Sequence, residues 1–202
     1  MKKVATLTAF VAGLGLLLTG TAFAAGTETN WYGGPVYDGA PTLEVTAALV
    51  KAGGGAEHFE FSKALVAMLG EKTVNTEVAK LNKQYGKKAV KEFIAGMTWD
   101  VHEGLRQATE AGVKLPEAPA DLKGTKLAET LVKAGTASDG TFYAGYLFDH
   151  VLSHKIHVGV MAAVNAKFGP ANDLNTHKIL NQAMYDVAHA LGHKDVKLAS
   201  LH

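Results

Sequence analysis

The chain has 202 residues, a formal net charge of +1, nine histidines and no cysteine. The balanced charge and the lack of a basic stripe with interleaved aromatics argue against nucleic acid as a partner. The absence of cysteine excludes disulfides, thiolate metal sites, a cysteine nucleophile and covalently attached c-type haem. A metal in this chain would have to be held by histidine, methionine, carboxylate or tyrosine side chains.

Residues 1–24 are typical of an export signal peptide. Two lysines follow Met1, residues 4–18 are small and apolar, and residues 22–24 read Ala-Phe-Ala, a cleavage motif. We expect cleavage after residue 24 and a periplasmic or secreted product. No cysteine follows, so a lipoprotein anchor is not expected. The rest of the chain has no apolar run of about 18 residues, so we expect a soluble mature protein with no membrane association.

The mature chain is predicted to be all-α, a helical bundle preceded by an irregular arm. Residues 25–41 alternate aromatics with glycine and proline, which disfavours a regular element. Beyond them, apolar residues recur at helical spacing, and period-two alternation is absent. Helices are expected at residues 42–52, 56–69, 73–85, 87–111, 141–168 and 173–191. The helix over 141–168 is either continuous or kinked near Ser153 and His154.

Two halves of the chain resemble each other. The pentapeptide at residues 49–53, Leu-Val-Lys-Ala-Gly, recurs at residues 131–135, and aromatic-Gly and aromatic-Asp-Val matches follow in the same order. Such recurrence predicts two tandem, similar multi-helix units. We place the first unit at 42–112, a proline-containing linker at 113–124 and the second unit at 125–202, and expect them to pack as one compact domain.

Three histidines lie close together in the second unit. His150, His154 and His157 are spaced by four and three residues, so a helix places them on one face, which is also its apolar face. The aligned positions of the first unit hold Met68, Lys72 and Asn75. The histidines therefore indicate a task specific to the second unit. Asp149 would project about 100° away from this face on a straight helix.

A fourth histidine, His177, points inward from the last predicted helix. A single metal site is best formed by His154, His157 and His177, with His150 assisting, because His150 and His157 would lie about 10 Å apart along a straight helix. Met161 follows His157 by one turn. A mixture of histidine and methionine favours Cu(I), whereas histidine by itself favours zinc or Cu(II).

Other functions stay open at this point. The apolar stripes and inward histidines also fit non-covalent b-type haem, with His154 and His177 as axial ligands, in an electron carrier or a haem-dependent redox enzyme. A structural or interaction protein with packed core histidines is a further alternative. Motifs for a nucleophile elbow, a zinc protease or a P-loop are absent, and no catalytic residue is predicted. Binding, storage or sensing of a metal or haem is therefore favoured over catalysis.

Overall fold

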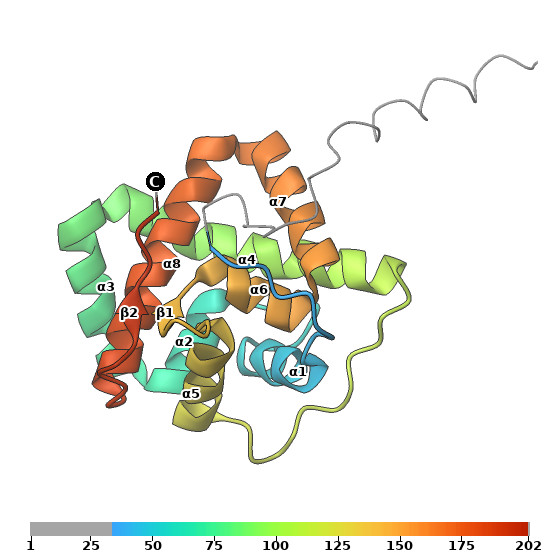
Figure 1. Cartoon of the computed structure of the whole chain (residues 1–202), viewed down its shortest axis with the longest axis horizontal. Coiled ribbons are helices and arrows are strands. Elements are labelled where there is room, and N and C mark those ends of the chain that lie inside the picture. Colours follow the sequence, from blue (N-terminus) through green and yellow to red (C-terminus); the bar gives the residue numbers. More distant parts are fainter. Residues whose placement is uncertain (1–33, 202) are drawn as a thin grey trace, which may run out of the picture.

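The computed structural model describes residues 34–201, which contain eight helices and one short parallel strand pair (Figure 1). The helices of the first half are α1 (Leu43–Ala52), α2 (Phe61–Leu69), α3 (Glu71–Tyr85) and α4 (Lys87–Glu110). Those of the second half are α5 (Gly124–Gly135), α6 (Ala144–Leu152), α7 (His154–Phe168) and α8 (Pro170–Ala190). The predicted all-α class is confirmed. None of these helices has the length and apolar character needed to cross a membrane.

The strand pair is a feature that the sequence pattern did not predict. Strand β1 (Thr141–Phe142) pairs in parallel with β2 (Lys197–Leu198), so the segment before α6 is joined to the segment after α8. Two residues per strand are too few to produce a visible alternation of polar and apolar residues. The predicted signal peptide and residues 25–33 of the predicted arm lie outside the described residues.

The predicted helix over 141–168 is broken, in agreement with the kinked alternative. Ser153 separates α6 from α7 with φ 77° and ψ 149°, and its hydroxyl accepts a hydrogen bond from the backbone N–H of Ile156 at 3.5 Å. Gly70 makes the same break between α2 and α3, with φ 77° and ψ 150°. Glycine adopts this conformation without a steric penalty, whereas a residue with a Cβ is strained there.

The helices of the two halves have similar lengths when taken in chain order. Helices α1 to α4 have 10, 9, 15 and 24 residues, and α5 to α8 have 12, 9, 15 and 21. A second matched break lies between the third and fourth helices, where Gly86 has φ 88° and Gly169 has φ 84°. The predicted tandem repeat and its unit boundaries stay predictions, and superposing residues 43–105 on 125–191 would test them.

Helices from both halves enclose one hydrophobic core. Buried side chains of α1, α2 and α4 pack in the same cluster as those of α5, α6, α7 and α8. Helix α4 runs across the middle of the molecule in Figure 1 and packs against α3, α7 and α8. A Cβ at Gly104 of α4 would lie 2.9 Å from Cδ1 of Leu152, so the absence of a side chain there lets the end of α6 approach α4.

The strain at Ser153 predicts an effect on stability. Ser153→Gly removes a backbone penalty of about 1–3 kcal/mol. The glycine loses more conformational entropy on folding, which costs about 0.5–1 kcal/mol. The variant also lacks the weak hydrogen bond by which the Ser153 hydroxyl caps α7. We expect the free energy of unfolding to rise by about 1 kcal/mol, measured by denaturant titration. Ser153→Ala is the matched control, because it keeps the strain and loses the cap, and it should be less stable than wild type. If Ser153→Gly were no more stable than Ser153→Ala, the claim that the backbone at Ser153 is strained would be wrong.

Candidate metal centre

A buried carboxylate, that of Asp149, lies at the centre of the histidine cluster. It is in the last turn of α6 and is 0% exposed. Its Oδ1 accepts hydrogen bonds from Nδ1 of His157 at 2.7 Å and Nδ1 of His154 at 3.1 Å. Its Oδ2 accepts a bond from the backbone N–H of Tyr37 at 3.1 Å. One ligand atom from each of Asp149, His154 and His157 lies within 4.8 Å of the other two, so these three side chains can hold a metal ion.

The helix break at Ser153 creates this arrangement. On a continuous helix the carboxylate of Asp149 would point away from the face that bears the histidines. The break changes the direction of the chain between α6 and α7, so both histidines of the first turn of α7 meet the carboxylate at the end of α6. Asp149 is the candidate ligand that the sequence pattern missed. The signal for it was the glycine break at Gly70, whose counterpart in the alignment of the two halves falls next to Ser153.

His157 is a neutral, buried imidazole. Its side chain is 2% exposed, and its pKa is lowered, chiefly by burial. Because a carboxylate only accepts hydrogen bonds, the proton of the neutral ring is assigned to Nδ1, and Nε2 carries the lone pair. Within the described part of the chain, Nε2 is buried without a hydrogen-bond partner. The second nitrogen is therefore available to a ligand on the other side of the ring.

His154 forms the solvent side of the group. Its side chain is 32% exposed, whereas those of His157 and Asp149 are 2% and 0% exposed. Its ring contacts that of His157, with ring centres 6.5 Å apart. An ion from solution would therefore approach along His154.

The structure does not bring His150 into the group. Its ring stacks on that of Tyr37, with ring centres 3.5 Å apart and planes 16° apart, and it meets the edge of Tyr146 at 4.9 Å. The pKa of His150 is lowered, chiefly by burial beneath these rings. His150 thus packs against the end of the arm, while its neighbour Asp149 faces α7.

His177 lies on the far side of His157. Its ring centre is 6.1 Å from that of His157, with planes 29° apart, and Phe148 packs against both rings. Its Nδ1 forms a hydrogen bond with the backbone carbonyl oxygen of Asp173 at 3.0 Å and lies 3.2 Å from Oδ1 of the same residue. His177 is outside the group of three around Asp149. The predicted haem ligands, His154 and His177, each contact His157.

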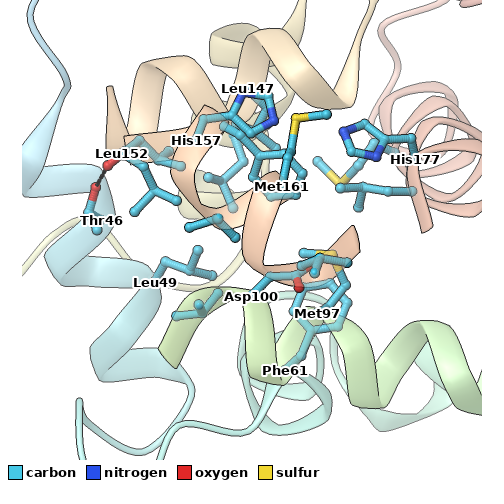
Figure 2. A pocket seen from close by; sticks show the side chains of 18 of the residues that line it. Thr46, Leu49, Phe61, Met97, Asp100, Leu147, Leu152, His157, Met161 and His177 are labelled. Carbon is cyan, nitrogen blue, oxygen red and sulfur yellow. Dashed lines mark hydrogen bonds between the residues drawn. The ribbon is translucent and has the colours of Figure 1, made fainter. Parts of the chain in front are cut away.

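An enclosed cavity of about 60 Å³ lies where the helices of the two halves meet (Figure 2). Most of its lining is apolar, but His157, His177, Asp100 and Asp173 also line it. Asp100 Oδ1 and Asp173 Oδ2 are buried and lack hydrogen-bond partners among residues 34–201. Buried polar atoms without partners are costly, so their gathering at one cavity marks it as a ligand or solvent site.

No protein-family model matches the chain, and comparison with curated proteins and with solved structures gave no significant match.

The raised pKa of Asp100 predicts that the stability of the protein depends on pH. Its pKa is raised to about 7, chiefly by burial and further by the charge of Asp173, from an ordinary value of 3.8. Between these values the folded protein binds a proton that the unfolded chain releases, so this carboxyl lowers stability as the pH rises from about 4 to about 7. Each pK unit corresponds to about 1.4 kcal/mol. The total is therefore a few kcal/mol.

The test compares Asp100→Asn with wild type in metal-free buffer. We expect the free energy of unfolding of the variant, relative to wild type, to increase by a few kcal/mol between pH 4 and pH 7.5. Asp195→Asn is the matched control, because it makes the same exchange of side chains at an exposed position. A pH-independent difference for Asp100→Asn would contradict the assignment.

Proposed function

We propose that this protein binds a divalent transition metal, Zn²⁺ or Cu²⁺, through Asp149, His154 and His157, and that it serves in binding, storage or sensing of the ion after export. The observation that carries the proposal is the buried group in which two imidazole nitrogens converge on one carboxylate oxygen. The export step is supported by the character of residues 1–24.

The donor set suits these ions. Imidazole nitrogen and carboxylate oxygen are the ligands that zinc and Cu(II) accept, whereas calcium and magnesium prefer oxygen donors. A metal bound at the Nδ1 atoms of His154 and His157 would move the proton of each neutral ring to its Nε2. Because a protonated imidazole has no lone pair for a metal, binding should weaken as the pH falls.

The surroundings hold the carboxylate in position. The backbone N–H of Tyr37 donates to Oδ2 of Asp149, which leaves Oδ1 directed at the two histidines. Groups that orient a ligand in this way contribute to metal affinity by reducing the freedom that is lost on binding. Tyr37 also stacks on His150, so the end of the arm is fastened next to the site.

Binding is favoured over catalysis by the burial of the site. Two of the three ligands have almost no contact with solvent, and access is along the partly exposed ring of His154. A catalytic metal needs an open coordination position and space for a substrate beside it. The buried group of Asp149, His154 and His157 instead fits capture or sensing of the ion itself.

Haem is a second candidate because two imidazoles line the same apolar cavity. That cavity has about 60 Å³, whereas pockets for organic ligands have about 300–1,000 Å³, so haem would require the surrounding helices to separate. Haem binding stays a prediction. Titrating the purified mature protein with haemin tests it, and a Soret band at one equivalent, lost in His177→Leu, would support it.

The metal proposal is tested by Zn²⁺ titration in a calorimeter. We expect one Zn²⁺ per chain in wild type. His154→Ala removes a ligand at a partly exposed position with little effect on the core, and it should lower the affinity at least about 10-fold, as should Asp149→Asn. At a free Zn²⁺ concentration of about 100 times the Kd, the free energy of unfolding of wild type should rise by about 2.7 kcal/mol.

The control is His58→Ala, since His58 is exposed and belongs to the first half. It should bind Zn²⁺ as wild type does. Absence of Zn²⁺ and Cu²⁺ binding in wild type would refute the proposal and leave packed histidines as the explanation of the cluster. Equal affinity in His154→Ala and His58→Ala would place the ion elsewhere.

A further inference from the structure

The second nitrogen of His157 points to a site that the Asp149 group does not use. Nδ1 donates to Asp149, while Nε2 is buried, carries the lone pair and has no hydrogen-bond partner within residues 34–201. The ring lines the enclosed cavity. A buried acceptor without a partner costs about 1–3 kcal/mol, so a cavity ligand that accepts this lone pair would recover a substantial free energy.

His177 presents a second imidazole to the same cavity. Its Nδ1 is engaged by Asp173, just as Nδ1 of His157 is engaged by Asp149. Metal-binding histidines in proteins commonly have one nitrogen held by a carboxylate or carbonyl, which sets the tautomer and directs the other nitrogen at the metal. Both rings are thus oriented by acidic residues on their outer sides.

The spacing of the two rings fits one shared ion. With metal–nitrogen distances of about 2 Å and about 1 Å from each nitrogen to its ring centre, two imidazoles on one ion have centres up to about 6 Å apart. The ring centres of His157 and His177 are 6.1 Å apart.

Met161 adds a soft donor. It is 3% exposed, lies one turn after His157 on α7 and lines the cavity. In Figure 2 its thioether lies between the imidazoles of His157 and His177, whereas Met97 lies at the other end of the cavity near Phe61 and Asp100. Thioether sulfur favours Cu(I) over zinc and over Cu(II).

The cavity itself favours a small, soft cation. At about 60 Å³ it can contain an ion but falls below the size of pockets for organic ligands. Its lining is mostly apolar, which disfavours ions that keep bound water. Asp173 beside His177 and Asp149 beside His157 place negative charge behind the ligands, which offsets the cost of burying a cation.

We propose that this cavity is a second metal site, selective for Cu(I), in which Nε2 of His157, His177 and the thioether of Met161 are the ligands. The inference rests on the proposed metal-binding function in that His157 belongs to both sites. We call the group of Asp149, His154 and His157 the outer site, and the group of His157, His177 and Met161 the inner site.

Sharing His157 makes the two sites compete. A neutral imidazole has one nitrogen with a free lone pair. An ion at the outer site uses Nδ1 and leaves the proton of the ring on Nε2. Cu(I) at the inner site uses Nε2, and the proton stays on Nδ1, which donates it to Asp149. Zn²⁺ and Cu(I) should therefore weaken each other's binding.

The experiment measures Cu(I) affinity without oxygen, by competition with a chromophoric Cu(I) chelator, for the full mature chain and three variants. We expect Met161→Leu to bind Cu(I) at least about 10-fold more weakly than wild type. Met97→Leu, the matched control, should bind like wild type, since it makes the same exchange of side chains away from the imidazoles. His154→Ala should keep its Cu(I) affinity although it loses Zn²⁺. X-ray absorption of the wild-type complex should show a sulfur ligand.

The outcomes separate the two proposals. Cu(I) binding that is lost in His154→Ala but unchanged in Met161→Leu would overturn the inner site and assign Cu(I) to the outer one. Absence of Cu(I) binding in wild type, or a copper centre without sulfur, would also overturn it, while Zn²⁺ binding would keep the outer site intact. Met161→Leu retains volume and apolar character, so the variant is expected to fold, which its circular dichroism verifies.

Discussion

The structure around the histidines depends on one buried carboxylate. Asp149 is removed from solvent, and a charge in that position is tolerated only with several good hydrogen bonds. Two of its donors are imidazoles of α7 and the third is the backbone of Tyr37. These bonds join α6, α7 and the end of the arm at one point. The position of His157, and through it the contact with His177 on α8, follows from this carboxylate.

The helical architecture could be predicted from the sequence because particular residue types, above all glycine, mark the ends of the helices. Gly86 and Gly169 end one helix and precede the next, and the ends of α1, α3 and α4 agree with their predicted positions within a residue or two. The break at Ser153 could not be assigned with the same rules, since serine rarely adopts a positive φ. Tertiary contacts stabilise that conformation, and a local pattern does not contain them.

The candidate site was predicted in part for the same reason. His154 and His157 were expected from helical spacing, which holds within the first turn of α7. Asp149 is not favoured by helical spacing, because a straight helix directs it elsewhere. The carboxyl groups of Asp100 and Asp173, which also line the cavity, come from two helices far apart in the chain. Helical periodicity describes one helix at a time, so it cannot predict which side chains from several helices meet in space.

The break at Ser153 also bears on the order in which the molecule can assemble. The proposed ligands of the outer site lie within nine consecutive positions, 149–157, so they can come together as soon as α6 and α7 form a corner. The partner ring on α8 lies 20 residues further along the chain, and its approach requires that helix to dock. Contacts that are close in sequence cost little loop entropy and form early, whereas distant ones follow. An ion captured during folding would therefore meet the outer site at the corner of α6 and α7 first. The inner site could compete for the ion only after α8 had docked and the core had closed.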